Sequence, residues 1–456
     1  MSEPQQQQPQ QLQPPEPSRA AGLSVALAVV LLAAASMLVM KIARGGEAKA
    51  PPPPKADSGA PWTEVELALM QSLSPPPELP PSPTNAVADD PKAATLGQRL
   101  FFDTRLSGDG TVSCASCHVP SLYFTDGRRF GLGLDETGRH VPTVIGAQWQ
   151  PFLFWDGRAD SVWAQALGPL EAENEHGMTR LSVARAVYTH HRAEYEALFG
   201  AMPAMGDLER FPEEARPVPM DSYHLHSQRW EAMSAADRKA INAVFANVGK
   251  ALEAYQRKLV PGVAPFDRYV AAVRGGDADG GGHLSTSAQR GLRAFIGEAQ
   301  CINCHNGPLL TDMTFHNLGL PRPPEAVGKP DLGRTLGAVE VLGSAFNCQG
   351  EFSDAAERCD ELTYLNPRFE DFRGAFKTPT LRNVSETGPY MHDGRFGTLE
   401  EVLAFYKSLP GEPEIGHREL VLELLDPDVS SADLVAFLES LTGPLPDARW
   451  LGPPTE

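Results

Sequence analysis

Basic residues and alternating β-type patterns are both scarce in this chain. Its 456 residues contain 39 Lys and Arg against 58 Asp and Glu, a formal net charge of -19, which argues against a nucleic-acid-binding surface. Continuous apolar-polar alternation is rare, which argues against a large β-sheet. The 42 prolines and 41 glycines argue against long uninterrupted helices. What remains is a soluble globular body, 42% hydrophobic and 21% charged, long enough for two core-bearing domains.

The N-terminal segment differs in composition from that body. Residues 1–19 are rich in Gln and Pro and cannot bury a core. Residues 20–40 are uncharged and, as a helix, would span roughly 31 Å, enough to cross a bilayer. We therefore predict a transmembrane anchor or uncleaved signal at 20–42; the alternative, a cleaved signal sequence, has a shorter apolar region. Residues 43–89, rich in Pro and Ala, are predicted to be a linker around one short helix at 62–73.

The charges beside the apolar segment point to a location in the cytoplasm. Lys41, Arg44 and Lys49 follow the segment and only Arg19 precedes it, so the positive-inside rule would leave the body on the cytoplasmic side. The cysteine chemistry described below outweighs this bias.

Three stretches carry helical patterns. Asp90 and the proline after it supply an N-cap and a first-turn proline. Thr286 and Gln289 have capping-box spacing in front of an apolar face at 292–296. Between them, apolar residues repeat every three or four positions over 235–259, which we take as the first helix of a second domain.

These patterns predict a mainly α fold built from two similar units in tandem. The N-terminal domain is expected at 90–230 and the C-terminal domain at 231–446.

Two strings of the form Cys-x-x-Cys-His occur in the chain. They are Cys114-Ala-Ser-Cys117-His118 and Cys301-Ile-Asn-Cys304-His305. One helical turn places both thiols along one edge of a porphyrin, where each can bond to a vinyl-derived carbon, while the histidine reaches the iron from one face. Two alternatives fit less well: a zinc site would require four ligands around the metal, and a thioredoxin-like cysteine pair would lack the histidine. The sequence therefore predicts two covalent hemes c in two cytochrome c-like domains.

Covalent attachment of this type requires reduced cysteines that meet heme on the outer side of the bacterial cytoplasmic membrane. We therefore expect the body in the periplasm, anchored to the inner membrane by the N-terminal segment. The remaining cysteines, Cys348 and Cys359, enclose a polar loop rich in Asp and Glu. In that compartment we expect a disulfide between them rather than two free thiols.

Several further strings, ordered along the chain, resemble the bacterial di-heme cytochrome c peroxidase family, including its MauG-type branch. They are LGQRLFFD (96–103), RLSGDG (105–110), FWDGRA (154–159), TPTLRNV (378–384) and PYMHDGRF (389–396). With the two heme strings they extend over about three quarters of the chain, far more than a single motif match. The resemblance implies an oxidoreductase, a cytochrome-c peroxidase that acts on hydrogen peroxide.

The resemblance assigns roles to individual residues. His118 and His305 would be the proximal ligands of the peroxide-reacting heme and of the electron-transfer heme. Trp155 would lie between the hemes as an electron relay, although most buried tryptophans only pack. Glu175 falls where the family has the carboxylate that takes a proton from peroxide and returns it to the leaving oxygen. Spacing alone does not separate Glu175 from the two glutamates shortly before it.

One departure from the peroxidase pattern concerns the first heme and a calcium ion. Residues 119–138 contain no histidine, whereas the family's peroxidases carry a removable distal histidine there, so we expect the first heme to be open at rest. His140 takes the place of an Asn that helps to hold an inter-heme calcium in the family. Thr387 and Pro389 match the other protein positions of that site, so one calcium ion is an open prediction.

A second departure is Tyr406, which stands where the peroxidases have the Met that completes the second heme and where MauG-type enzymes have a Tyr. A phenolate favours ferric and higher-valent iron, so a heme held by His305 and Tyr406 would have a lowered potential and accept electrons poorly from an ordinary cytochrome c. The alternative is that Tyr406 is a core aromatic on a helix at 399–409. Met391 and Met178 would then be the axial candidates.

Three functions are consistent with these residues. The first is reduction of hydrogen peroxide by an external donor, such as a c-type cytochrome or a cupredoxin, and the acidic charge would attract a small basic carrier. The second is MauG-like oxidation of residues on a partner protein, which Tyr406 favours. The third, a non-catalytic electron carrier, would require a sixth ligand on the first heme, and the lack of histidine at 119–138 counts against it.

Overall fold

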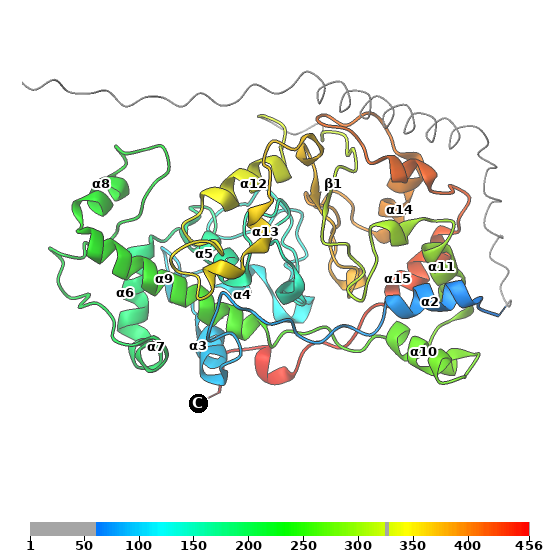
Figure 1. Ribbon diagram of the computed structural model, residues 1–456, viewed down its shortest axis with the longest axis horizontal. Helices are drawn as coiled ribbons and strands as arrows, with labels where there is room; N and C mark the ends of the chain where they lie inside the picture. Colours follow the sequence, from blue (N-terminus) through cyan, green and yellow to red (C-terminus); the bar gives the residue numbers. More distant parts are fainter. Residues whose placement is uncertain (1–60, 324–327, 456) are drawn as a thin grey trace, which may run out of the picture. The chain divides into compact units, whose positions relative to one another are not determined.

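Helices supply nearly all the regular structure in the described residues, 61–323 and 328–455, of the computed structural model (Figure 1). The α-helices are α2 Glu64–Ser72, α3 Pro91–Phe101, α4 Cys114–Cys117, α5 Val162–Glu171, α6 Arg180–His190, α7 Arg192–Phe199, α8 Leu225–Ala232, α9 Ala235–Gln256, α10 Pro265–Arg274, α11 Thr286–Ile296, α12 Arg334–Gly343, α13 Asp360–Thr363, α14 Leu399–Ser408 and α15 Ser431–Glu439. Two short strands, β1 Phe315–His316 and β2 Phe376–Lys377, pair antiparallel. The prediction of a mainly α fold is confirmed.

Two predicted segments, the tail at 1–19 and the anchor at 20–42, lie outside the described residues. Among the helices found at 61–323 and 328–455, none is both long and apolar enough to cross a membrane. The anchor stays a prediction.

The N-terminal core forms around α9. Its buried residues, Val244 and Leu252 among them, pack against α3, α5 and α6. The helix α3 comes so close that a Cβ atom on Gly97 would lie 1.8 Å from the carbonyl oxygen of Ala251. We expected α9 to open the second domain, but its buried apolar side chains belong to the first core. The domain boundary near residue 230 stays a prediction. The helical spacing of the apolar residues predicts the helix, but it does not indicate which other helices pack against it.

The C-terminal core pairs α11 with α15 in a similar way. A Cβ atom on Gly291 would lie 1.9 Å from the carbonyl oxygen of Asp433, so the absence of a side chain lets the two helices approach closely. The N-cap of α11 is Ser285, whose hydroxyl accepts a 3.1 Å hydrogen bond from the N–H of Ala288. Thr286, which the sequence favoured as the cap, is the first helical residue. In both halves, a glycine-bearing helix precedes the Cys-x-x-Cys-His string and packs against a later helix.

The two ends of the described chain pack on opposite cores. Near the start, α2 lies against α11 (Figure 1), Met70 is fully buried in the C-terminal core, and the indole of Trp62 donates a 2.8 Å hydrogen bond to the hydroxyl of Tyr269. Near the end, the carbonyl oxygen of Trp450 accepts a 2.6 Å hydrogen bond from Tyr255 of the N-terminal core. The second part of the predicted linker is therefore folded body rather than spacer, because its apolar side chains are buried there.

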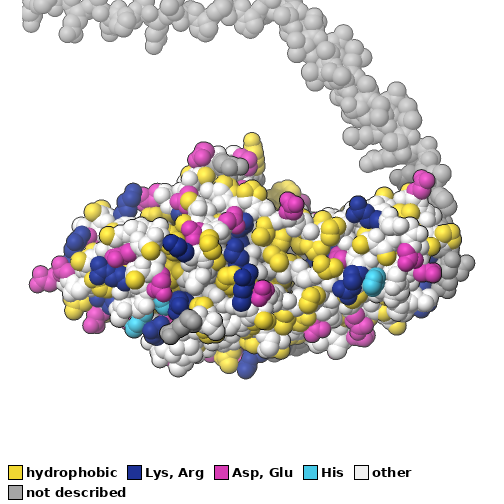
Figure 2. Space-filling view, turned by 90° about the horizontal axis from the view of Figure 1, so that it is seen from below, with side chains coloured by type: hydrophobic (Ala, Val, Ile, Leu, Met, Phe, Trp, Pro, Cys, Tyr) yellow, Lys and Arg dark blue, Asp and Glu magenta, His cyan; other side chains and the backbone are white. Residues whose placement is uncertain are grey.

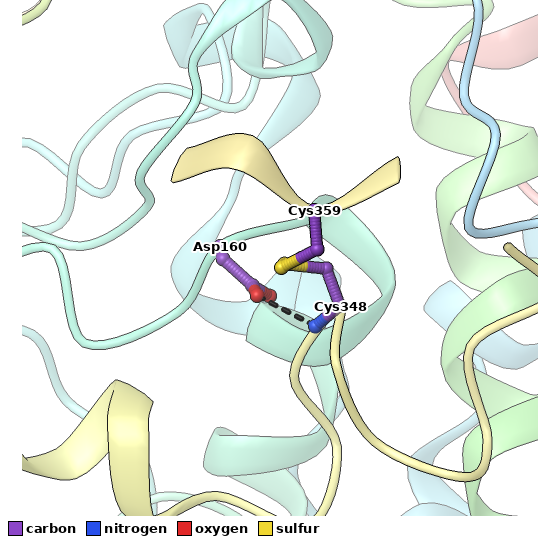
Figure 3. A group of neighbouring side chains, drawn as sticks. All are labelled: Asp160, Cys348 and Cys359. Atoms are coloured by element: carbon purple, nitrogen blue, oxygen red, sulfur yellow. Dashed lines mark hydrogen bonds between the residues drawn. A yellow bond between two sulfur atoms is a disulfide. The ribbon is translucent and has the colours of Figure 1, made fainter. Parts of the chain in front are cut away.

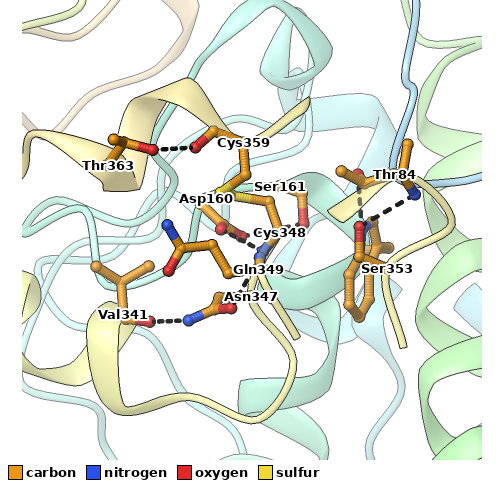
Figure 4. Close-up of a disulfide and its surroundings, with 12 residues drawn as sticks. Thr84, Asp160, Ser161, Val341, Asn347, Cys348, Gln349, Ser353, Cys359 and Thr363 are labelled. Carbon is orange, nitrogen blue, oxygen red and sulfur yellow. Dashed lines mark hydrogen bonds between the residues drawn. A yellow bond between two sulfur atoms is a disulfide. The ribbon is translucent and has the colours of Figure 1, made fainter. Parts of the chain in front are cut away.

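A disulfide joins Cys348 to Cys359, whose Cα atoms are 5.4 Å apart. Figure 3 shows the carboxylate of Asp160 beside it, where Oδ2 accepts a 2.7 Å hydrogen bond from the N–H of Cys348. In the wider view of Figure 4, the hydroxyl of Thr363 donates a 2.9 Å hydrogen bond to the carbonyl oxygen of Cys359. Because Asp160 directly follows the string at 154–159, its hydrogen bond with Cys348 connects the disulfide-closed loop between α12 and α13 to that string.

Candidate functional site

Each Cys-x-x-Cys-His string forms a single helical turn. In the first string, which includes α4, the N–H of His118 donates a 2.9 Å hydrogen bond to the carbonyl oxygen of Cys114. In the second, which begins with the 3-10 turn η5 Cys301–Asn303, the N–H of His305 donates a 2.9 Å hydrogen bond to the carbonyl oxygen of Cys301. The same backbone contact therefore fixes each histidine relative to the first cysteine of its string.

Both histidine rings are oriented by a backbone carbonyl. Nδ1 of His118 lies 3.0 Å from the carbonyl oxygen of Phe124, and Nδ1 of His305 lies 3.0 Å from that of Leu310. Burial lowers the pKa of both histidines and outweighs the opposing effect of these carbonyls. A neutral imidazole that donates from Nδ1 keeps the Nε2 lone pair for a metal. Both rings are therefore suited to ligate a heme iron.

The two strings open on one cavity of about 1120 Å³. Its lining includes Cys117, His118, Cys301, Cys304 and His305. Small-molecule pockets usually occupy ~300–1,000 Å³, so this cavity is at least as large as the pocket for one large ligand. Cysteine thiols that form no disulfide, placed beside neutral imidazoles, are the donor set of covalent hemes. The residues present therefore fit two such groups.

Trp155 lines the same cavity and is held from two directions. Its indole nitrogen donates a 2.8 Å hydrogen bond to the carbonyl oxygen of His140, and its carbonyl oxygen accepts a 2.8 Å hydrogen bond from the N–H of Lys377 in β2. The side chain lies at the wall of the cavity that both strings share and belongs to neither large apolar core.

The three glutamates that spacing could not separate lie in different environments. Glu171 forms a 2.8 Å ion pair with Arg180. Glu173 is exposed and pairs with Arg216 at 3.1 Å. Glu175 alone of the three lines the cavity, and no described residue donates a hydrogen bond to its carboxylate. Glu175 is therefore the one of these three glutamates that a substrate in the cavity can reach, and its catalytic role stays a prediction.

The environment of Glu175 suits proton transfer. Burial raises its pKa, and the guanidinium of Arg158 lowers it part of the way back. Arg158 is itself held by a 3.1 Å ion pair with Asp156, and its guanidinium carbon lies 3.5 Å from the centre of the Phe154 ring. A carboxyl group whose pKa lies above its ordinary value can take and return a proton closer to neutral pH.

The residues at the expected calcium position do not fit a calcium ion. Calcium takes oxygen ligands, whereas His140 presents two nitrogens. Its Nδ1 lies 2.9 Å from the carbonyl oxygen of Arg128, and its Nε2 lies 3.2 Å from that of Thr387. Thr387, one of the two residues that match the calcium site, therefore already faces an imidazole through its carbonyl oxygen. Pro389 lines the cavity nearby.

Tyr406 lies on α14 and lines the cavity, with a hydroxyl that has no hydrogen-bond partner among residues 61–323 and 328–455. Burial raises its pKa, and the nearby cysteine thiols add to this. Met391 also lines the cavity. Met178 does not; it is buried in the N-terminal core. Tyr406 and Met391 both line the cavity and remain candidates for the axial ligand of the second heme.

Among the basic residues of the cavity that sequence reasoning missed are His316 and Lys377. His316 lies between two carboxylates, 2.7 Å from Asp312 and 2.9 Å from Glu419, and the hydrogen bond to Asp312 is the main cause that raises its pKa to about 11. Glu419 is distant along the chain, so no local pattern could have revealed the pair. Lys377 directly precedes the string at 378–384 and carries no motif of its own.

Comparison with known proteins points to one family. A family model described as di-haem cytochrome c peroxidase matches residues 91–275. The cytochrome-c peroxidase IdrP1 of Denitromonas iodatirespirans is 33% identical over 377 residues, covering 80% of this chain and 86% of the relative. The methylamine utilization protein MauG of Methylorubrum extorquens is 33% identical over 391 residues, covering 85% and 88%.

Comparison with solved structures finds proteins of similar fold. A MauG-like protein associated with microbial copper homeostasis is similar with a TM-score of 0.54 and 26% identity, over 82% of this chain and 96% of that protein. The diheme peroxidase BthA from Burkholderia thailandensis shares the fold, with a TM-score of 0.54 and 23% identity over 80% and 88%. The sequence relatives span most of both chains and accord with a cavity lined by two heme-binding strings. The chain is therefore an oxidoreductase that belongs to the di-heme cytochrome c peroxidase family.

Proposed function

We propose that this protein reduces hydrogen peroxide with electrons from an external donor protein. The observation that carries the proposal is that Glu175, Trp155, His118 and His305 line one cavity. His118 would hold the heme on the peroxide side and His305 the electron-transfer heme. Heme iron supplies the redox centre that binds peroxide and exchanges electrons. The net reaction takes up two electrons and two protons and yields two water molecules.

Glu175 is the residue that we assign to proton movement. Its carboxylate would take a proton from hydrogen peroxide and return it to the oxygen that leaves as water. The lack of a hydrogen-bond donor to this carboxylate among the described residues leaves its oxygens available to the substrate. Arg158 favours the ionised form of this carboxylate, because its charge opposes the effect of burial on the pKa of Glu175.

Trp155 is the residue that we assign to electron transfer between the hemes. Two backbone hydrogen bonds fix its orientation at the shared cavity, through its indole nitrogen to His140 and from Lys377 to its carbonyl oxygen. A fixed orientation keeps the path between donor and acceptor constant, which a merely space-filling tryptophan would not need.

The donor is expected to be a small c-type cytochrome or a cupredoxin. The net charge of -19 favours approach by a basic carrier. On the face shown in Figure 2, acidic and basic side chains are interspersed among apolar ones. We therefore expect docking to combine apolar contact with charge pairing, and its rate to fall only moderately with salt.

We place the body in the bacterial periplasm, anchored to the cytoplasmic membrane by the predicted segment at 20–42. Covalent heme attachment belongs to that compartment, and the disulfide between Cys348 and Cys359 suits it as well.

A second candidate is peroxide-dependent oxidation of residues on a partner protein, as the relatedness to MauG suggests. The observation that favours it is the free hydroxyl of Tyr406 at the cavity wall. A phenolate on the second heme would lower its potential, so that this heme would share oxidising equivalents rather than collect electrons from a carrier.

A plain electron carrier would need a ligand opposite His118. His140 is the nearest histidine along the chain, and both its ring nitrogens already face carbonyl oxygens, of Arg128 and of Thr387. This arrangement counts against a capped first heme.

Two measurements test the proposal. Electron paramagnetic resonance of the untreated ferric protein should show a high-spin signal beside a low-spin one; two low-spin signals would contradict an open peroxide site. Steady consumption of peroxide with reduced cytochrome c or cupredoxin would then support the donor-driven reaction. Inert donors, together with a mass change on a co-expressed partner protein, would favour the MauG-like reaction instead.

A further inference from the structure

Lys377 is a basic residue of the cavity that neither the peroxidase mechanism nor the family strings use. It ends β2, where it lies opposite Phe315 of β1, and its N–H donates a 2.8 Å hydrogen bond to the carbonyl oxygen of Trp155. The pairing with β1 and the hydrogen bond to Trp155 therefore fix the position of its backbone. The residue lines the cavity that the two heme-binding strings share.

The ammonium group of Lys377 has no hydrogen-bond or ion-pair partner in the described part of the chain. Other basic side chains of the same cavity do have carboxylate partners. They are Arg139 with Asp156 at 2.6 Å, Arg158 with Asp156 at 3.1 Å and Arg395 with Asp393 at 2.7 Å. Burial, which no neighbouring acid opposes, lowers the pKa of Lys377 to about 7. Among the described residues, none therefore supplies a counter-ion to this buried ammonium group.

An uncompensated buried charge is costly, and a hydrogen-bonded anion removes most of that cost. The groups that this cavity fits carry anions of the right kind, because each heme has two propionate carboxylates at one edge. Hydrogen peroxide is neutral and offers no such charge. We propose that Lys377 forms an ion pair with a propionate of one of the two hemes and thereby positions that heme edge beside Trp155.

This pairing has an electrical consequence. A cation near a heme stabilises the ferrous form, which holds one more electron, and so raises the midpoint potential of that heme. Lys377 would then act as a positioning residue that also tunes the electron path. The inference rests on the heme sites and does not require peroxide to be the substrate.

The test uses the full-length protein with both hemes attached, in the variants Lys377→Met and Lys377→Arg. Lys329→Met is the matched control, because it removes the same charge from an exposed side chain at the same cavity, where solvent screens it. Midpoint potentials of both hemes are measured by spectroelectrochemical titration. Resonance Raman spectra report the propionate bending mode, which responds directly to the partner of the carboxylate.

Lys377→Met should lower the potential of one heme and shift its propionate mode, whereas Lys377→Arg and Lys329→Met should leave both close to wild type. The heme that responds is the one that Lys377 holds. Unchanged potentials and modes in Lys377→Met would overturn the inference. Should that variant not acquire both hemes, Lys377→Gln is measured against the same criteria. Neither readout uses peroxide, so the outcome is independent of whether the protein proves to be a peroxidase.

Discussion

The indole nitrogen of Trp155 donates a 2.8 Å hydrogen bond to the carbonyl oxygen of His140. The imidazole of the same His140 lies 3.2 Å from the carbonyl oxygen of Thr387, and the backbone N–H of His140 donates a 2.9 Å hydrogen bond to the carbonyl oxygen of His392. One residue therefore connects the proposed relay tryptophan to the segment at 387–392. In the family pattern, an asparagine and a calcium ion stand at this point.

We predict that the wild-type protein holds no calcium here and that His140→Asn creates a calcium dependence. An asparagine replaces the imidazole by an amide oxygen and frees the carbonyl of Thr387, which gives the oxygen ligands that calcium prefers. Calcium at one hundred times its Kd should then stabilise the variant by about 2.7 kcal/mol. Metal analysis and melting temperatures with calcium or a chelator measure this. A wild-type protein that copurifies with calcium and loses stability in chelator would contradict the prediction.

The second prediction concerns Glu175. Replacing it by Gln removes the proton acceptor while keeping the size of the side chain, so kcat/KM for peroxide should fall by roughly 10²- to 10⁴-fold. The ferric electron paramagnetic resonance spectrum should keep both signals, since no proposed iron ligand changes. Glu173→Gln is the matched control: that side chain is exposed, and turnover should not change. Equal losses in both variants would exclude a special role for Glu175.

The third prediction follows from Arg158, whose charge lowers the burial-raised pKa of Glu175. Glu175 must be ionised to accept a proton, so activity should rise as pH increases through its pKa. Arg158→Gln removes the opposing charge, raises that pKa, and should move the acidic limb of the kcat/KM profile to higher pH. The exposed Lys239, replaced by Met, provides the same charge change as a control. An acidic limb that stays in place would show that another group controls it.

Sequence patterns predicted the chemistry of this protein better than its packing. The spacing within each Cys-x-x-Cys-His string is local, and the structure keeps it as one helical turn. The choice of Glu175 over Glu171 was not local, because it depends on the pairing of Glu171 with Arg180 and on which side chain reaches the cavity.

The partners of whole helices were also beyond the sequence. The apolar period of α9 identified the helix but could not say that its partners would be α3 and α5. The Pro-rich composition before residue 90 did not indicate that α2 would pack on the C-terminal core. Met70 of α2 is fully buried there. Such contacts join segments far apart in the chain, and no window along one sequence contains them.

The fourth prediction tests Tyr406. If its oxygen completes the second heme, Tyr406→Met should alter the low-spin signal, leave the high-spin signal in place, and raise the potential of the second heme, because a thioether stabilises ferrous iron better than a phenolate does. Reduced cytochrome c should then become a better donor. Tyr390→Phe is the control: Tyr390 also lines the cavity, but its hydroxyl donates to the carbonyl oxygen of Val384 at 3.1 Å. An unaltered low-spin signal in Tyr406→Met would point to Met391 instead.

The fifth prediction concerns stability away from the cavity. The carboxylate of Asp103, at the end of α3, lies 2.7 Å from Nε2 of His191, and both side chains are almost fully buried. Burial raises the pKa of Asp103, but hydrogen bonds from His191 and Arg105 outweigh it, and the net pKa is well below the ordinary value. A lowered pKa contributes stability that is present above the ordinary pKa of the group and lost as pH falls.

Asp103→Asn should therefore cost about 3–5 kcal/mol near pH 7, the range for breaking a buried pair. The cost should shrink as pH falls below the ordinary pKa of Asp, because the unfolded wild-type chain then takes up a proton that the folded carboxylate, with its lower pKa, does not. Melting temperatures of both proteins across this pH range, with hemes attached, measure the difference. Asp428→Asn, at an exposed site, should match wild type at every pH. A difference that stays constant with pH would mean that packing, rather than the charge of Asp103, holds α3 to His191.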